Sequence, residues 1–314
     1  MKLSVQSGNL IPDFDYETAY RMIREAGFDA IDWNINTCWK FKELQSAKEL
    51  KNLCIFEKPL EEILAHYEKE LQAIRKNGLT ISQAHTPFGA YAPYREDILD
   101  YAITIYEKMI RFCSAVECPH LIIHGISMTE NEPDMTPARC EELNMKLYGS
   151  LIPTLLEVGN VTVCLENLFT SPKRLGADYW EGCCSDPHEA AAWIDRLNGM
   201  AGKTCFGFCL DTGHLNLLRK NLRTYIPVVG NRIVALHIHD NDQKADSHLM
   251  PYAGSIFWDD FLRALKEIGY QGDLSFETFG QYAKKRLPAE LTQAFLGTVG
   301  RIGAYFREEL RRAE

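Results

Sequence analysis

Ionisable side chains stand at the ends of six consecutive apolar segments of this sequence. Residues 121–123 and 233–236 are typical of these segments, which consist almost wholly of branched or small apolar residues. Each segment then reaches a histidine, an aspartate or a glutamate, and the six are His85, His124, Glu166, Asp211, His237 and Glu277. Three more candidates follow in the next loops: His214, Asp246 and His248. Imidazoles and carboxylates act as general acids and bases and also bind divalent metals, so the set suits either chemistry.

One such residue alone has an ordinary structural explanation. A single histidine at the end of a strand is usually a hydrogen-bonded structural residue, and a single acid there usually caps a helix or is solvated. Six in succession are different, because charges buried together need a neutralising cation. The pattern therefore predicts a divalent metal. His239 points to the same side of its strand as His237. Of the two, His237 is the expected ligand, and His239 is expected either to cap or line the rim or to be a structural residue.

The apolar segments alternate with segments of helical periodicity, and together they form eight βα units. We expect strands at residues 2–6, 28–33, 79–85, 120–124, 161–166, 205–211, 233–239 and 273–277. The main helices are expected at residues 60–76, 95–116, 137–158, 215–229, 257–268 and 289–312, with two more opening at Asp15 and near Ser185. The pattern predicts one α/β domain over residues 1–314, a single (β/α)₈ TIM barrel whose strand ends carry the chemistry. An open doubly wound sheet is the alternative, but no glycine-rich phosphate loop follows the first strand.

The composition excludes several other classes of protein. Hydrophobic residues make up 46% and charged residues 25%, as in soluble globular proteins. The 34 Lys and Arg against 43 Asp and Glu give a net charge of −9, which argues against a nucleic-acid partner. No apolar run is long enough to cross a membrane. The ten cysteines form no C-x-x-C motif and no signal peptide is recognised, so we expect mostly reduced thiols in a cytoplasmic protein. The adjacent Cys183 and Cys184 are expected to lie in an ordinary loop.

Short motifs in the second half of the sequence carry a family resemblance. They are Leu-Glu-Asn at 165–167, Leu-Asp-Thr-Gly-His at 210–214, His-Ile-His-Asp-Asn-Asp at 237–242, Asp-Ser-His at 246–248 and Phe-Glu-Thr at 276–278. Each is weak alone, but in this order the chain resembles the xylose-isomerase-like TIM-barrel superfamily. That superfamily contains sugar isomerases and epimerases and also endonuclease IV.

The resemblance implies a metal site and a reaction. In the family, positions matching Glu166, Asp211, His237 and Glu277 hold one divalent ion: Mn²⁺, Zn²⁺, Mg²⁺ or Co²⁺. In related ketose epimerases, the two matching glutamates flank the sugar, and one removes the proton beside the carbonyl while the other returns it. Glu166 and Glu277 are thus the expected catalytic residues of a metal-dependent isomerase or epimerase in carbohydrate metabolism. The expected partner is a small sugar, sugar phosphate or keto-sugar, and a homo-oligomer is allowed.

The remaining ionisable residues leave alternatives open. His85, His124, His214, Asp246 and His248 are expected to bind the substrate or a second metal, with His214 contacting a substrate hydroxyl. Together with the four ligands they also match, in order, the trinuclear zinc set of endonuclease IV, which cleaves DNA at abasic sites. Gln243 and Lys244 stand near where free-ketose 3-epimerases carry an arginine, so a metal-dependent lyase or dehydratase acting on an oxidised sugar is a further alternative. A non-enzymatic scaffold is disfavoured because no ligand is missing.

Aromatic residues near the strand ends are candidates for the wall of a sugar pocket. Trp33 and Phe88 are predicted to form this wall, whereas Trp258 opens a helix and is expected to pack in the core. Residues 34–59, with Trp39 and Phe41, are interpreted as a lid or as a surface insertion.

Overall fold

Eight parallel strands form a barrel in the computed structural model, which describes residues 1–11, 13–35, 41–92, 94–128, 135–171, 178–280 and 287–312. The strands are β1 (Leu3–Gln6), β2 (Ala30–Asn34), β3 (Thr80–His85), β4 (His120–Ile122), β5 (Thr162–Glu166), β8 (Phe206–Asp211), β9 (Ile233–His237) and β10 (Leu274–Phe276). Their order is β10-β1-β2-β3-β4-β5-β8-β9. A parallel bridge between Ile238 and Phe276 joins the two ends, with Ile238 N–H donating to Ser275 O at 2.8 Å. The predicted (β/α)₈ barrel is confirmed.

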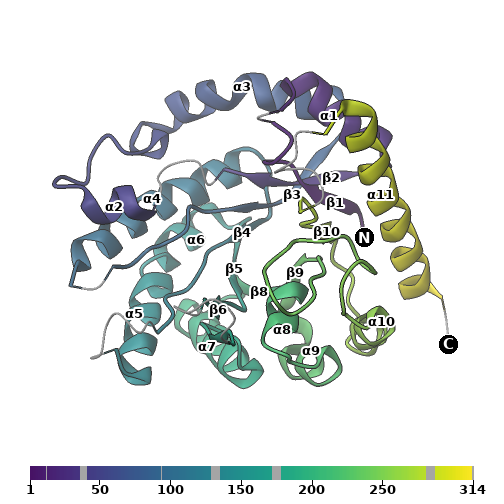
Figure 1. Cartoon of the computed structure of the whole chain (residues 1–314). Helices are drawn as coiled ribbons and strands as arrows, with labels where there is room; N and C mark the ends of the chain where they lie inside the picture. The colour runs from purple at the N-terminus through teal and green to yellow at the C-terminus, as the bar shows by residue number, and fades with distance from the viewer. Residues whose placement is uncertain are drawn as a thin grey trace.

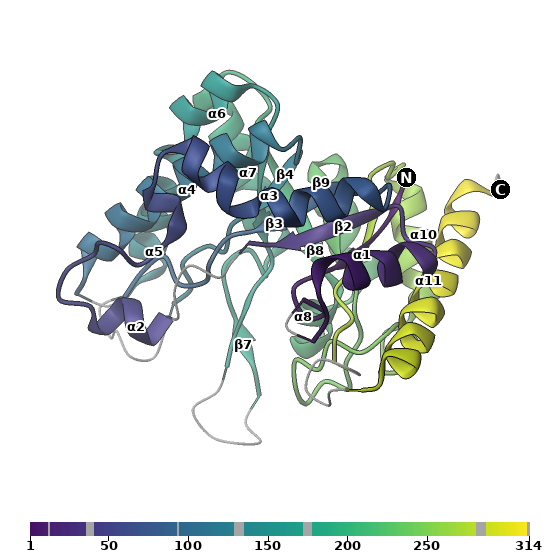
Figure 2. The ribbon, with the colours of Figure 1, turned by 90° about the horizontal axis from the view of Figure 1, so that it is seen from above.

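Helices surround this barrel (Figures 1 and 2). The larger ones are α1 (Tyr16–Glu25), α3 (Leu60–Lys76), α4 (Glu96–Ala115), α5 (Pro137–Gly149), α7 (Pro187–Ala201), α9 (Leu222–Val229), α10 (Trp258–Glu267) and α11 (Ala289–Arg311). Asp15 caps α1 by accepting from Thr18 N–H at 3.0 Å. Asp186 caps α7, which has Pro187 in its first turn, so this helix opens near Ser185 as expected.

Two predicted helices are each divided in the structure. The helix expected over residues 137–158 is α5 followed by α6 (Ile152–Val158). Pro153 lacks an N–H and its ring would clash with the carbonyl of Gly149, so a continuous helix cannot form there. The helix expected over residues 215–229 is α8 (Thr212–Leu217) and then α9. Arg219 between them has a φ of 55°, outside helical geometry, and Asn221 caps the new helix.

Smaller elements complete the fold. A two-stranded antiparallel hairpin, β6 (Phe169–Thr170) and β7 (Trp180–Glu181), stands where only a loop was expected. Short helices are α2 (Phe41–Ser46), η1 (Ile55–Glu57) and η2 (Gly230–Arg232). Eight of the cysteines are free and buried, as expected, whereas Cys54 is disulfide-bonded. No helix in the described part of the chain is long and apolar enough to span a membrane.

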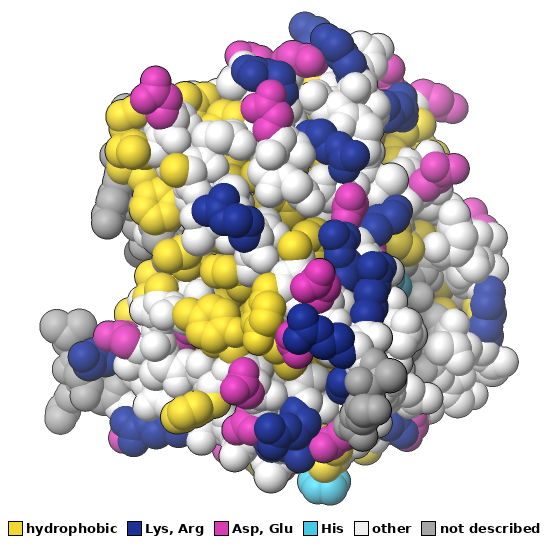
Figure 3. All heavy atoms as spheres, turned by 90° about the vertical axis from the view of Figure 1, so that its right-hand side faces the viewer, with side chains coloured by type: hydrophobic (Ala, Val, Ile, Leu, Met, Phe, Trp, Pro, Cys, Tyr) yellow, Lys and Arg dark blue, Asp and Glu magenta, His cyan; other side chains and the backbone are white. Residues whose placement is uncertain are grey.

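One face of the molecule exposes aromatic side chains. Figure 3 shows hydrophobic residues among charged ones on the side covered by α10 and α11. Tyr252 and Tyr305 are 54% and 44% exposed, and each packs beside Phe306.

Candidate metal centre and pocket

A cavity of about 480 Å³ opens at the carboxyl ends of the strands. Eight of the nine ionisable candidates line it: His85, His124, Glu166, His214, His237, Asp246, His248 and Glu277. The ninth, Asp211, is fully buried and contacts His237 at the end of β8. The fold therefore brings all nine residues together, because parallel strands deliver their last residues to one end of the barrel.

Three carboxylates surround one nitrogen of His237. Its Nδ1 lies 2.9 Å from Glu166 Oε1, 3.9 Å from Asp211 Oδ2 and 3.7 Å from Glu277 Oε2. Ligands bound to one ion at about 2.1 Å stand about 3.0 to 3.4 Å from their neighbours. The Glu166 contact is close to this spacing, and the Asp211 and Glu277 contacts are a few tenths of an ångström longer. Glu166, Asp211 and His237 offer ligand atoms within 4.8 Å of one another.

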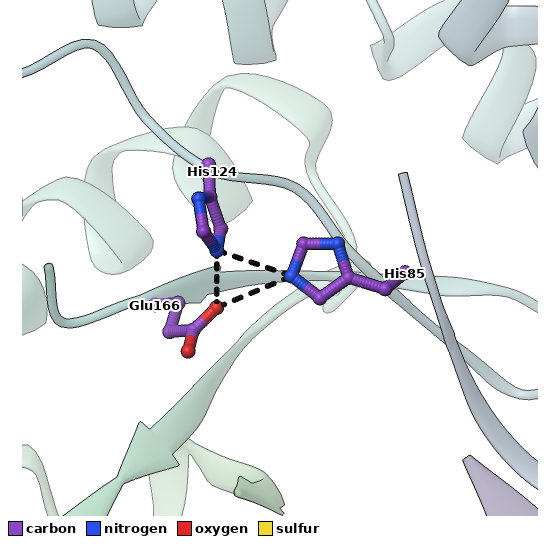
Figure 4. Close-up of side chains that lie close together, drawn as sticks. All are labelled: His85, His124 and Glu166. Carbon is purple, nitrogen blue, oxygen red and sulfur yellow. Dashed lines mark hydrogen bonds and ion pairs between the residues drawn. The ribbon is translucent and has the colours of Figure 1, made fainter. Parts of the chain in front are cut away.

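Two histidines make a second group on the other oxygen of Glu166 (Figure 4). His124 Nε2 lies 2.9 Å from Glu166 Oε2, and His85 Nε2 lies 3.6 Å from it. The two Nε2 atoms are 3.1 Å apart. Figure 4 shows both rings converging on the carboxylate from neighbouring strand ends, so Glu166 can bridge two positions.

His214, Asp246 and His248 form a third group in the pocket, next to the proposed ligands Glu166 and Glu277. His248 Nε2 is 2.9 Å from Asp246 Oδ2, and His214 Nε2 is 3.9 Å from the same oxygen. His214 donates from Nδ1 to Asn167 O at 2.9 Å, which leaves Nε2 facing the carboxylates of Asp211 and Asp246. This group can contact a substrate hydroxyl or contribute to a further metal.

The electrostatics of the centre suit metal binding at Glu166 and His124, whereas His237 must release a proton to bind one. Burial would lower the pKa of His237, but neighbouring groups that include Cys209, Glu166 and Glu277 raise it well above its usual range. Burial alone would raise the pKa of the Glu166 carboxyl, but His237 and His124 outweigh it and hold this pKa well below its usual range. Burial lowers the pKa of His124 to about 4 even though Glu166 is adjacent. At neutral pH, Glu166 is thus an anion and His124 a neutral imidazole. These are the forms that bind metals.

Several residues that support the centre escaped the sequence analysis. Asp32 Oδ2 lies 3.1 Å from His237 Nε2 and accepts from Gln83 Nε2 at 2.8 Å. The sequence did contain a signal for Asp32, since it is an acidic residue within an otherwise apolar strand. Asn167 joins β5 to β8 by donating to Asp211 O and accepting from Asp211 N–H.

His239 and Gly213 explain part of the Asp-Thr-Gly-His motif. His239 is fully buried, with Nε2 2.9 Å from Asp211 Oδ1, so it supports Asp211 and does not line the pocket. A Cβ on Gly213 would lie 2.0 Å from His239 Cε1. Glycine is therefore required beside this ring.

The predicted pocket wall needs one correction. Phe88 lines the pocket, but Trp33 is 1% exposed and packs between the barrel and the helices, against Tyr67 and Phe112. Side chains alternate along a strand, so Trp33 must face outward when Asp32 faces inward. Trp258 is buried in the core, as expected.

The proposed lid also finds little support in the described residues. Trp39 and the side chain of Phe41 lie outside them. Within residues 41–59, Phe56 is fully buried and packs against Phe112 of α4, and none of these residues lines the pocket. This part of the segment is an insertion packed on the helical layer.

Residues 20–297 match the family model described as a xylose isomerase-like TIM barrel, and the chain belongs to this family. An uncharacterized protein of Sinorhizobium fredii, y4fM, is 23% identical over 82% of this chain and 79% of its own length. A D-psicose 3-epimerase of Enterocloster bolteae is 31% identical over 29% of this chain and 27% of its own length. The solved structure of an L-ribulose 3-epimerase is 16% identical with a TM-score of 0.68, and the match covers 99% of this chain and 96% of the other. That similarity shows the fold.

Proposed function

We propose that this protein is a divalent-metal-dependent isomerase or epimerase that moves a proton next to the carbonyl of a sugar. The observation that carries the proposal is the convergence of Glu166, Asp211 and Glu277 on His237 Nδ1 at the mouth of the barrel. The names of two similar proteins, the psicose and ribulose 3-epimerases, agree with this chemistry.

The residues present fit a metal. Three carboxylates and an imidazole are a ligand set that Mn²⁺, Zn²⁺, Mg²⁺ and Co²⁺ accept. Glu166 and Asp211 are almost fully buried, and such negative charge is costly unless a cation compensates it. A bound ion would supply positive charge for the oxyanion that develops on the sugar.

Glu166 and Glu277 act as the two proton-transfer groups in this proposal. They come from β5 and from the end of β10, which are separated around the barrel, so a sugar bound between them presents a different face to each. One carboxylate removes the proton beside the carbonyl, and the other delivers a proton to the far face. His214 Nε2 faces the pocket and can hold a substrate hydroxyl.

The test follows deuterium uptake from D₂O into ketoses, 3-keto sugars and their phosphates with Mn²⁺ present. We expect Glu166→Gln and Glu277→Gln each to reduce turnover about 10² to 10⁴-fold without unfolding the protein. Glu62→Gln on the exposed face of α3 is the control and should keep full activity. Unchanged exchange in either pocket variant would contradict the two-base proposal, and a metal-free active protein would contradict the metal.

A second candidate is phosphodiester cleavage by several metals. The group of His85, His124 and Glu166 and the group around Asp246 and His248 favour it, because they provide further ligand positions beside the first. The net charge of −9 opposes it, since DNA binding requires several phosphates to be neutralised. Nicking of an abasic DNA duplex with Zn²⁺, together with three bound ions per chain, would favour this function over the first.

A further inference from the structure

The pocket has a sector that the proposed reaction does not use. Three uncharged amide side chains line it at the ends of β1 and β2: Gln6, Asn9 and Asn34. In the barrel order, β1 and β2 stand between β10 and β3. Three of the four proposed metal ligands come from β5, β8 and β9, on the other side of the barrel. The amide sector is therefore a neighbour of the metal centre and separate from its ligands.

The three amides line the pocket, and two of them are hydrogen-bonded to each other. Asn9 Nδ2 donates to Gln6 Oε1 at 2.9 Å, and Gln6 is 6% exposed. Asn34 Oδ1 is buried and has no hydrogen-bond partner among the described residues. A Cβ on Gly8 would lie 2.4 Å from Asn34 Cβ, so the glycine leaves room for this side chain. Amides both donate and accept, as sugar hydroxyls require.

Aromatic rings stand on both sides of the amides. Phe88 follows β3, is 48% exposed and packs 4.7 Å from the ring of His124. Phe279 follows β10 and stacks on His248 at 4.2 Å. Both rings line the cavity. The sector thus combines fixed amides with flat apolar faces, which match the hydroxyls and the C–H face of a sugar ring.

From these observations we infer that the amide sector binds a second sugar ring, so that the substrate is a glycoside and not a free monosaccharide. The inference rests on the proposed function for the ring at the metal centre. The cavity of about 480 Å³ holds the volume of about 16 water molecules at ~30 Å³ each, which leaves space beside one sugar ring. No Lys or Arg lines it within the described ranges, so the sector suits an uncharged group.

Equilibrium binding of unreactive sugars tests this inference independently of turnover. Glucose, trehalose, cellobiose and maltose are titrated calorimetrically into the metal-loaded and the EDTA-treated protein. At least one disaccharide is expected to bind about tenfold or more tightly than glucose in both forms. Asn34→Ala should bring the ratio of the glucose Kd to the disaccharide Kd to within about twofold of one.

A second variant tests whether a lost preference in Asn34→Ala could result from unfolding of that variant. Gly8→Ala keeps every amide but displaces Asn34, and it should lower the ratio in the same way. Gln72→Ala, on α3, is the matched control and should leave the ratio unchanged. Equal binding of glucose and all three disaccharides overturns the inference, and so does a ratio that survives both pocket variants. If the wild-type protein shows no deuterium exchange but keeps its preference for a disaccharide over glucose, the proposed reaction is overturned and the inference of a second sugar ring is not.

Discussion

Two buried glutamates, one at the barrel mouth and one in the helical layer, have opposite surroundings. Glu166 is 1% exposed and lies among imidazoles, with His237 and His124 each 2.9 Å away. Glu70 on α3 is 7% exposed and accepts from neutral donors, the Tyr20 hydroxyl at 2.5 Å and Trp33 Nε1 at 2.9 Å. Both carboxyl groups are buried, but Glu166 contacts two imidazoles directly, whereas at Glu70 the imidazole of His66 has only a minor effect.

The difference appears in their acidity. Burial raises the pKa of the Glu70 carboxyl, and its hydrogen bonds from Tyr20 and Trp33 only partly oppose this. At Glu166 the histidines reverse the effect of burial and the pKa falls well below its usual range. Burial alone therefore does not mark a functional carboxylate. The charge of its partners decides whether it serves the fold or binds a cation.

The largest effect is the expected difference in metal binding between the variants Glu166→Gln and Glu70→Gln. Glu166→Gln removes a ligand oxygen from the centre and should weaken Mn²⁺ or Zn²⁺ binding by at least about 100-fold. Glu70→Gln should leave metal binding unchanged. Elemental analysis after dialysis and calorimetric titration measure both. Equal metal content in the two variants would contradict the distinction.

A smaller effect is expected from replacing Glu70, which should lower stability and leave metal binding unchanged. Glu70→Ala leaves the Tyr20 hydroxyl and the Trp33 indole N–H buried without their acceptor, which should cost about 2 to 5 kcal/mol of unfolding free energy. Urea denaturation of the metal-free protein measures this change. Metal titration of the same variant should match the wild type, and a loss of metal binding would show that Glu70 acts on the centre.

The smallest effect concerns pH. The raised pKa of Glu70 means that the folded protein binds its proton more readily than the unfolded chain does. Stability due to this group is thus full below the unfolded pKa and is lost as pH rises through the folded pKa. Glu70→Gln lacks this loss, so its stability relative to the wild type should improve as pH rises through that window. Paired urea titrations at several pH values measure the difference, and a pH-independent difference would refute it.

Much of the fold was predictable because the sequence repeats one pattern. Apolar strands alternate with amphipathic helices, and the barrel follows from that order, whereas the family resemblance came from the motifs at the strand ends. Pro153 was a signal for the division of the helix over residues 137–158, since proline removes a backbone hydrogen bond within a helix. The helical periodicity on both sides of it led to the prediction of one continuous helix. The hairpin of β6 and β7 has two residues in each strand, too few for any periodic signal.

The ionisable residues of the site were predictable for a related reason. His85, Glu166 and Asp211 interrupt apolar strands at their ends, where parallel strands converge. The amides Gln6 and Asn34 were missed because such residues are common at strand ends and nothing in their type demands a ligand. Trp33 was misplaced because its direction depends on which neighbour faces inward, and Asp32 takes that side.

The pairing of β1 with β10 has a consequence for how the chain reaches its active form. Leu3 pairs with Leu274, so β1 cannot pair with β10 until residues 274–276 have been synthesised. Contacts this distant in sequence form late in folding. Glu277 follows β10, and its N–H bonds to Ile238 O across the seam. A nascent chain therefore holds three of the four proposed ligands before the barrel closes, and closure and completion of the centre happen in the same step.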